Sequence, residues 1–180
     1  MRVAEFTRTW AMPSADTFSV APIGAFVARW QRGVVVDPFA RNVPATYAND
    51  LNPETAAEFH MGAVEFCDEM LKRGVVADCV RFDPPYSPRQ ISEVYAGIGK
   101  PCGMADTQSA VLYAEVRKRL ARLLRVGGVA LSFGWNSCGF GPSFEMREIL
   151  LVAHGGAHND TICLAEVKVQ GDLFPPEGRT

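Results

Sequence analysis

Hydrophobic and polar positions along this chain follow two patterns, one typical of helices and one typical of buried strands. Apolar residues at helical spacing predict three helices, at residues 22–32, 63–72 and 107–126. Short apolar runs bounded by turn residues predict strands at 34–36, 45–49, 75–82, 129–133, 146–153 and 161–169. The last two strands are joined by a glycine-rich turn, which indicates an antiparallel hairpin.

Strands that alternate with helices and end in a hairpin indicate an α/β fold, with a mainly parallel sheet and helices on both faces. We expect a single domain over residues 1–180, with an irregular segment at 1–21 and a frayed tail at 171–180. Less regular patterns predict a short helix opened by Pro53, a third strand containing Met61, and a cap at Gly127-Gly128 for the third helix. A separate target-recognition domain has no room in this chain.

Composition narrows the class of protein. Apolar residues make up 48% of the chain and charged residues 21%, which is ordinary for a globular domain. The net charge of −2 gives no general attraction to nucleic acid, although a local basic patch can suffice. No long apolar stretch and no signal-peptide core occur, so we expect a cytoplasmic protein that does not cross a membrane.

Cysteine and histidine spacing does not favour a metal site. The 5 cysteines include no C-x-x-C pair, and their odd number argues against a disulfide framework. His154 and His158 are four residues apart, but Gly155-Gly156 between them indicates a turn rather than a helix face. We therefore expect no bound metal.

Three predicted strands end on acidic residues. The strand before Asp83 stops at Pro84-Pro85-Tyr86, because prolines cannot donate to a central sheet ladder. Asp37 and Asp50 follow two earlier strands in the same way. Since the carboxyl ends of parallel strands share one edge of a sheet, the three acids are predicted to line a single crevice.

The motifs around these acids, and their order along the chain, resemble those of S-adenosylmethionine-dependent amino-methyltransferases, especially the bacterial and phage DNA adenine-N6 methyltransferases. Asp83-Pro84-Pro85-Tyr86 matches the family's catalytic tetrapeptide, and residues 34–40 (Val-Val-Val-Asp-Pro-Phe-Ala) resemble its cofactor motif, D-P-F-x-G-x-G. Residues 124–131 resemble the family's helix–Gly-Gly–strand passage, and Phe18 with Pro22-Ile23 resembles the segment over the methionine end of the cofactor. The resemblance implies a Rossmann-like methyltransferase fold, with a sheet of the seven-stranded type.

The resemblance also assigns roles to individual residues. Asp83 and the Pro84 carbonyl would accept the two N–H groups of an exocyclic amine, and Tyr86 would stack on the base. Residues expected to contact the substrate are Pro85, Tyr86, Ser87, Arg89 and Gln90. Residues expected to border S-adenosylmethionine are Thr17, Phe18, Asp37, Pro38, Phe39, Asp50, Leu51 and Asp83, with Asp50 on the ribose hydroxyls.

The sequence departs from the family pattern at the cofactor end. Residues 40–44 (Ala-Arg-Asn-Val-Pro) lack the motif's glycines, and Met61-Gly62-Ala63 offers no acid for the cofactor adenine. Only eight residues separate Asp37 from Thr46, too few for a helical crossover, so the first crossover helix is predicted to be missing. These changes predict weakened cofactor binding within an intact fold.

Three functions remain open from the sequence. The first is methylation of adenine N6 in DNA, and the second is methylation of RNA or of a small heteroaromatic amine. The third is a non-catalytic member that binds nucleic acid or a protein, which the missing glycines favour and the Asp83–Tyr86 motif opposes. A second copy of the chain or a partner subunit could supply target recognition.

Overall fold

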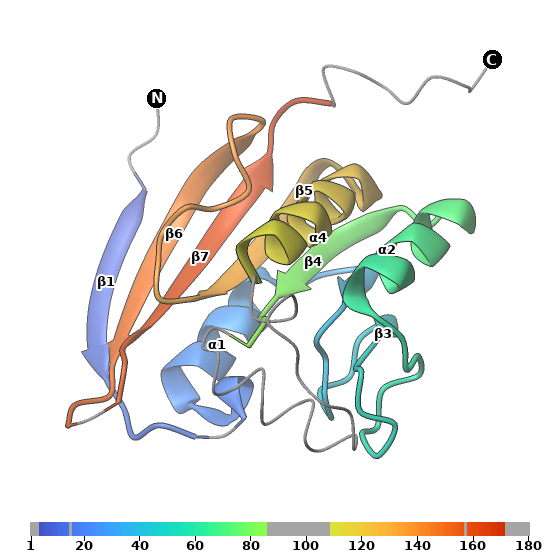
Figure 1. The fold of residues 1–180 in the computed structure, drawn as a ribbon. Coiled ribbons are helices and arrows are strands. Elements are labelled where there is room, and N and C mark those ends of the chain that lie inside the picture. Colours follow the sequence, from blue (N-terminus) through green and yellow to red (C-terminus); the bar gives the residue numbers. More distant parts are fainter. Residues whose placement is uncertain (1–3, 15, 86–108, 157, 172–180) are drawn as a thin grey trace.

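A seven-stranded mixed sheet runs through the computed structural model, which describes residues 4–14, 16–85, 109–156 and 158–171 (Figure 1). The strand order is β1-β6-β7-β5-β4-β2-β3. The strands are β1 (Glu5–Trp10), β2 (Val35–Asp37), β3 (Tyr47–Ala48), β4 (Ala77–Phe82), β5 (Leu124–Gly134), β6 (Phe144–Ala153) and β7 (Thr161–Lys168). β7 is antiparallel to β5 and β6, and the other neighbouring pairs are parallel. This confirms the predicted α/β sheet with its C-terminal antiparallel hairpin.

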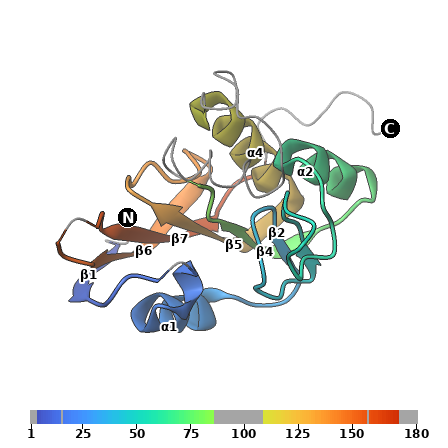
Figure 2. The ribbon, with the colours of Figure 1, turned by 60° about the horizontal axis from the view of Figure 1, so that its bottom comes forward.

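Helices cover both faces of the sheet (Figure 2). A short 3-10 helix, η1 (Thr17–Ser19), leads into α1 (Ala21–Trp30), which lies on one face. The other face carries α2 (Ala63–Lys72) and α4 (Ser109–Leu123), which pack against each other. The buried side of α1 contributes Ile23, Phe26 and Val27 to a core shared with β5, β6 and β7. The helices predicted from apolar spacing at residues 22–32 and 63–72 are thus confirmed.

The C-terminal end of α4 differs from the prediction. The helix ends at Leu123 and β5 begins at Leu124, so Gly127 and Gly128 lie within β5 and do not cap the helix. Instead, the Lys168 Nζ donates hydrogen bonds to the carbonyl oxygens of Ala121 (2.6 Å) and Leu124 (3.0 Å). A cation at a helix C-terminus is favourable, and this one comes from a distant strand that local sequence does not reveal.

The N-terminal segment is also more regular than predicted. Residues 5–10, expected to be irregular, form β1, which pairs in parallel with β6 and places Phe6 beside Ile149. Most β1 side chains are exposed, so the strand has none of the apolar run that identifies a buried strand. Pairing with a strand near the other end of the chain creates β1, and local sequence could not show it.

The connections around β3 are short and irregular. No helix occurs between β2 and β3, which confirms the missing first crossover helix. Residues 51–62 contain neither the helix predicted at Pro53 nor the strand predicted at Met61, and only one parallel bridge forms, between Asn49 and Phe59. The buried Asn49 side chain makes the hydrogen bonds that strand pairing would otherwise make between these loops. Its Nδ2 donates to the Pro38 carbonyl and its Oδ1 accepts the Met61 N–H.

Candidate active site

The Asp83-Pro84-Pro85 turn lies directly after β4, an interior strand next to the middle strand β5. β4 is almost entirely buried and pairs with β2 on one side and β5 on the other. Pro84 is buried and Asp83 is partly buried. The Tyr113 hydroxyl of α4 donates a hydrogen bond to the Pro85 carbonyl, which anchors the turn to the helix.

The other two strand-end acids lie at the same edge. In the parallel register Asp37 pairs with Ala48, and Val36 pairs with Val80, so β2, β3 and β4 run in the same direction side by side. Asp37, Asp50 and Asp83 therefore all lie at the carboxyl end of these strands. The topology places the three acids at one edge of the sheet, and Asp37 is fully buried there.

Asp37 is fully buried and forms an ion pair within the protein. Its Oδ2 lies 2.8 Å from the Nε of Arg81, a β4 residue that is itself only 1% exposed, and its Oδ1 accepts the Phe39 N–H. Burial raises the pKa of Asp37 to about 6, although the Arg81 guanidinium acts in the opposite direction. We take the carboxylate to be ionised, because a neutral Asp37 would leave the guanidinium buried without a counter-charge.

Arg81 also fills the space between β4 and the N-terminal helices. Its Nη2 donates to the Pro44 carbonyl at 2.9 Å, and its guanidinium lies 5.3 Å from the ring centre of Phe18. Sequence analysis missed this residue. The signal was an arginine inside an apolar central strand, since a charge at such a position needs a buried partner.

Asp50 organises the loop that follows β3. Its Oδ1 accepts the Asn52 N–H at 2.8 Å and its Oδ2 accepts the Arg41 N–H at 3.2 Å. Arg41 occupies the first position where the family motif has glycine, with a positive φ of 50°, and its side chain pairs with Asp16 at 3.3 Å. A carboxylate has about four acceptor sites, so Asp50 retains capacity for the two hydroxyls of a ribose.

Thr17 and Phe18 belong to η1, directly before α1. The Phe18 ring packs edge-on against Phe133 of β5, with ring centres 4.8 Å apart. This contact places Phe18 close to the end of the central strands, where the sequence predicted it would face the cofactor. Pro38 is buried, and Phe39 and Leu51 are partly buried.

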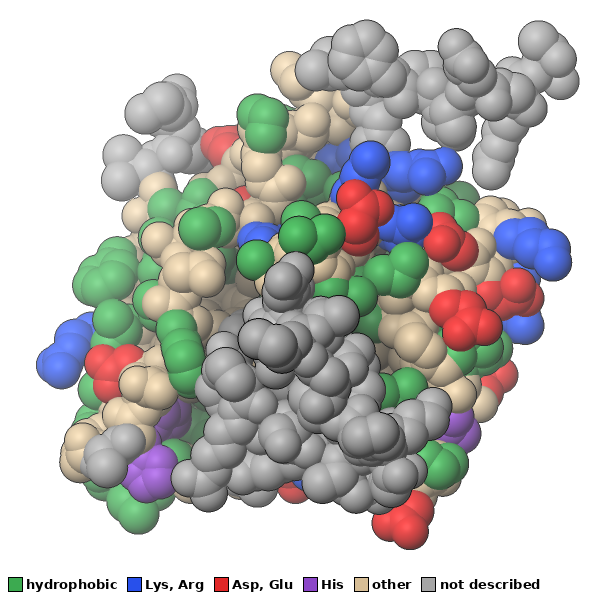
Figure 3. All heavy atoms as spheres, viewed as in Figure 1, with side chains coloured by type: hydrophobic (Ala, Val, Ile, Leu, Met, Phe, Trp, Pro, Cys, Tyr) green, Lys and Arg blue, Asp and Glu red, His purple; other side chains and the backbone are tan. Residues whose placement is uncertain are grey.

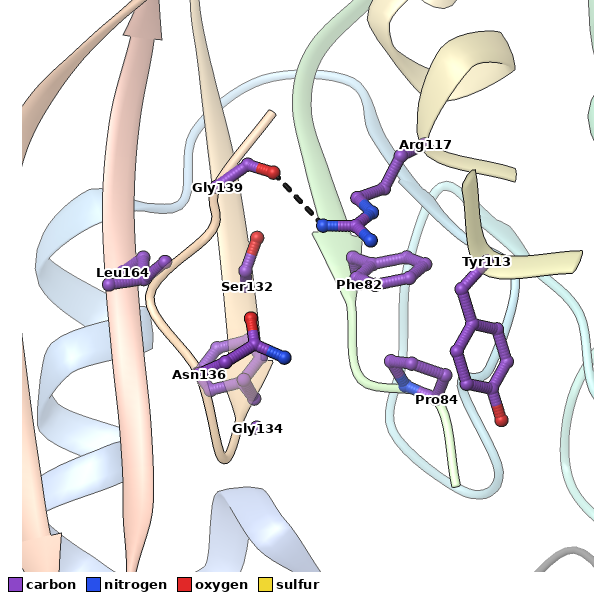
Figure 4. Close-up of a pocket in the computed structure, with 10 residues that line it drawn as sticks. Phe82, Pro84, Tyr113, Arg117, Ser132, Gly134, Asn136, Gly139 and Leu164 are labelled. Atoms are coloured by element: carbon purple, nitrogen blue, oxygen red, sulfur yellow. Dashed lines mark hydrogen bonds between the residues drawn. The ribbon is translucent and has the colours of Figure 1, made fainter. Parts of the chain in front are cut away.

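A small cavity lies beside Pro84, between β4, β5 and α4 (Figure 4). Its volume of about 60 Å³ is far below the roughly 300–1,000 Å³ of ligand pockets and is suited to water. Arg117 lies at one side with its guanidinium 5.4 Å from the Phe82 ring centre, and its Nη1 donates to the Gly139 carbonyl at 3.1 Å. The buried Ser132 Oγ, also in the lining, has no hydrogen-bond partner among the described residues.

Glu166 of β7 fixes the loop that closes this cavity. Its Oε2 accepts the Phe140 N–H at 2.9 Å. A Cβ on Gly139, which has a φ of +60°, would lie only 2.4 Å from the Glu166 Oε1. Burial raises the pKa of Glu166 to about 7, and the Phe140 N–H and Arg117 oppose the shift. The loop therefore packs tightly around a carboxyl group that titrates near neutral pH.

We expect the Glu166 carboxyl to make folding stability depend on pH. Its pKa is higher in the folded than in the unfolded chain, so folding favours the protonated form and stability falls as pH rises from about 4.5 to about 7. Glu166→Gln keeps an acceptor for the Phe140 N–H and should remove this part of the slope. Urea unfolding of both proteins at pH 5 and 8 measures it: the variant should gain on the order of 2 kcal/mol relative to the parent at pH 8. An equal pH dependence in both would contradict the assignment.

Four of the predicted substrate residues, Tyr86, Ser87, Arg89 and Gln90, lie outside the described residues, and their roles stay predictions.

Among the residues described, no cluster of three His, Cys, Asp or Glu side chains could hold a metal ion. No helix in the described ranges is long and apolar enough to cross a membrane.

The hydrogen-bond acceptors of the site fit S-adenosylmethionine at its ribose end and differ from the family pattern at its methionine end. Asp50 has spare acceptor capacity for a ribose, and Asp83 lies at the same edge beside the Pro84 carbonyl. At the methionine end, the predicted partner Asp37 is buried and neutralised by Arg81, so its carboxylate faces the protein interior. Cofactor contacts at that end would come from Phe18 and Phe39.

Comparison with solved structures identifies the fold. The chain superimposes on the crystal structure of TrmN from Thermus thermophilus with a TM-score of 0.54 and 16% sequence identity, over 83% of this chain and 49% of that one. The chain thus spans about half the length of that neighbour. No protein-family model and no curated protein matches the sequence. The architecture is a Rossmann-like methyltransferase fold, as the motifs predicted.

Proposed function

We propose that this protein transfers a methyl group from S-adenosylmethionine to an exocyclic amine of a nucleobase, with adenine N6 in DNA as the first candidate. The observation that carries the proposal is the position of Asp83-Pro84-Pro85. The turn follows β4, an interior strand of a methyltransferase-type sheet, at the edge where Asp37 and Asp50 also lie. A structural domain has no evident need for the Asp50 and Asp83 carboxylates at one partly desolvated edge, whereas Asp37 is neutralised by Arg81 in the interior.

Asp83 and the Pro84 carbonyl account for the chemistry on the amine. The lone pair of an exocyclic amine is delocalised into the ring, so the nitrogen is a poor nucleophile. Hydrogen bonds from its two N–H groups to the Asp83 carboxylate and the Pro84 carbonyl would draw the nitrogen towards a tetrahedral geometry. The bond to Asp83 is charge-assisted and therefore the stronger of the two.

Tyr113 would help to hold the turn in place for this chemistry. Tyr113 anchors the Pro85 carbonyl, and the Tyr113 ring packs edge-on against Phe82 and Phe39 at centre distances of 6.0 and 6.3 Å. S-adenosylmethionine would supply an electrophilic methyl group. Asp50 would hold the cofactor through its ribose hydroxyls, and rigid positioning of both reactants would provide much of the rate enhancement. A base in a duplex would first have to flip out of the stack.

A calorimetric titration with S-adenosylmethionine tests the first step, and transfer of labelled methyl groups tests the second. Unmethylated duplex DNA, single-stranded RNA of the same sequence and free adenosine are offered in parallel. Mass spectrometry of the nucleosides then separates N6-methyladenine from N4-methylcytosine. Transfer to RNA or adenosine alone would favour the second candidate. Absence of cofactor binding would favour a non-catalytic member, which the neutralised Asp37 makes a specific alternative.

We expect Asp50→Ala to weaken cofactor binding and to leave the chemical step nearly unchanged. The loss of two hydrogen bonds to ribose hydroxyls should raise the dissociation constant for S-adenosylmethionine at least about tenfold. Because Asp50 also accepts the Arg41 and Asn52 N–H groups, Asp50→Asn serves as a second variant that keeps an acceptor for the loop. Glu54→Ala removes an exposed acid from the same loop and should have no effect. Equal affinities for the parent and Asp50→Ala would contradict the ribose assignment.

A further inference from the structure

The outer part of the sheet (β7, β6 and β1) has one face that no helix of the described residues covers. α4 and α2 cover this face over β4 and β5, and α1 covers the opposite face (Figure 2). Residues 135–143 lead from β5 to the parallel strand β6 without a helix, so no helix is packed over β7, β6 and β1 on this side within the described residues. We call this surface the outer face.

Strand register identifies the side chains of the outer face. Leu150 and Val152 of β6 belong to the core under α1, so the alternate residues Ile149 and Leu151 point to the outer face. Phe6 pairs with Ile149, and alternation along β1 places Arg8 and Trp10 on the same side. The apolar members of the outer face are Phe6, Trp10, Trp135, Ile149, Leu151 and Ile162.

Three large aromatic side chains on or beside these strands are strongly exposed. Phe6 is 63% exposed, Trp10 61% and Trp135 45%. Figure 3 shows hydrophobic side chains gathered on the side of the molecule formed by β1, β6 and β7. Large exposed apolar patches usually mark interaction sites, and aromatic residues are enriched at the centres of protein–protein interfaces.

The outer face carries two complementary features next to each other, since Arg8 pairs in register with Leu151. Phe6 and Trp10 project from β1 at the edge of the sheet, with the exposed Arg8 between them. Near β7 lies an open hollow of about 430 Å³, lined by Trp135, Leu151, His158, Asn159, Asp160 and Ile162. β1 therefore offers aromatic projections and a cation, and the hollow offers a lining of both apolar and polar side chains, including the exposed Asp160.

We propose that the outer face binds a second copy of this chain through a two-fold symmetric interface. In such an interface residue i contacts residue j and j contacts i, so one surface must contain both complementary parts. The projecting aromatics of each copy would enter the hollow of the other, and Arg8 would pair with Asp160 of the second copy. The three aromatic side chains alone would bury roughly 300 Å², a substantial share of the roughly 800 Å² per partner in a standard interface.

Charge favours a protein over a nucleic acid as the occupant. Nucleic-acid surfaces neutralise phosphates with several lysine or arginine side chains. Among the described residues, Arg8 is the only such side chain assigned to the outer face, and Asp160 carries the opposite charge. The dimer would also border the candidate active site. Trp135 directly precedes Asn136, which lines the cavity beside Pro84.

Sedimentation velocity of the full chain tests the proposal. The parent protein should sediment as a dimer at micromolar concentration, and Trp10→Glu should raise the dimer dissociation constant at least about a hundredfold, since it places a charge in the apolar contact. Val76→Glu is the matched control, because Val76 is 62% exposed but lies next to β4, away from the outer face. It should remain dimeric. Circular dichroism verifies that each variant is folded.

A charge exchange gives an independent test. Arg8→Asp and Asp160→Arg should each weaken the dimer, and the double variant should restore it, because the pair then re-forms with reversed signs. A parent chain that is monomeric at about 100 μM would overturn the proposal. Equal weakening by Val76→Glu and Trp10→Glu would also overturn it. A monomer whose oligonucleotide binding is lost in Trp10→Glu would assign the outer face to nucleic acid instead.

Discussion

Replacement of Asp83 by alanine should abolish most methyl transfer and leave cofactor binding nearly unchanged. The substitution removes the charge-assisted hydrogen bond that would activate the amine, an interaction that strengthens as the nitrogen becomes tetrahedral. Loss of one preorganised hydrogen-bonding group from an oxyanion hole costs about 10²–10³ in turnover, and we expect a loss of that order here. Single-turnover transfer from labelled S-adenosylmethionine measures the rate, and calorimetry measures the affinity.

Asp83→Asn separates the charge of this residue from its role as an acceptor. The amide oxygen can still accept an N–H, but the bond is no longer charge-assisted, so the rate should lie between those of the parent and the alanine variant. A matched control is Asp68→Ala, which removes an exposed carboxylate on α2 away from the strand ends. If Asp83→Ala retained the parent rate, the assignment of the active site to this turn would be wrong.

Sequence alone predicted the parts of this fold that depend on local signals. The helix at residues 63–72 is one example: its apolar spacing, and a turn directly after it, define both ends. The end of β4 is another, because two prolines cannot continue a central strand wherever the chain folds. The common edge shared by the three strand-end acids followed from parallel topology.

The features that sequence analysis missed depend on distant partners. β1 exists because it pairs with β6, and α4 ends where Lys168 of β7 reaches its last carbonyls. No strand forms at Met61. Instead, the Asn49 side chain binds backbone groups of the two loops that contain Pro38 and Met61. Each of these partners lies far away in the chain or bonds through a side chain, so the spacing of apolar residues could not predict the interaction.

At the cofactor end of the site, the structure gives Asp37 an internal partner that the motif did not predict. The motif at Asp37 indicated a carboxylate that faces the cofactor, but its charge is compensated inside the protein by Arg81. The buried pair also contacts the loop that lacks the motif's glycines. Arg81 donates hydrogen bonds to the carbonyls of Val43 and Pro44 in that loop. Weak cofactor affinity therefore remains the expectation at this end, now with a structural reason.

Removal of one partner of the Asp37–Arg81 pair should strongly destabilise the protein. Arg81→Met leaves a buried carboxylate without a counter-charge, and Asp37→Asn leaves a buried guanidinium; each should cost about 3–5 kcal/mol in the free energy of unfolding. By contrast, Arg73→Met removes a surface ion pair with Glu69 and should cost less than about 1 kcal/mol. Urea unfolding at pH 7 measures all three.

The double variant Asp37→Asn/Arg81→Met should be more stable than either single variant, because no unpaired charge remains buried. Strictly additive losses would show that the two residues do not act as a pair. The pH dependence gives a further check. Without Arg81 the pKa of Asp37 rises further, so Arg81→Met should lose less stability at pH 5, where Asp37 is neutral in the folded state, than at pH 8. If the folded double variant binds S-adenosylmethionine like the parent, Asp37 supports the loop and does not bind the cofactor.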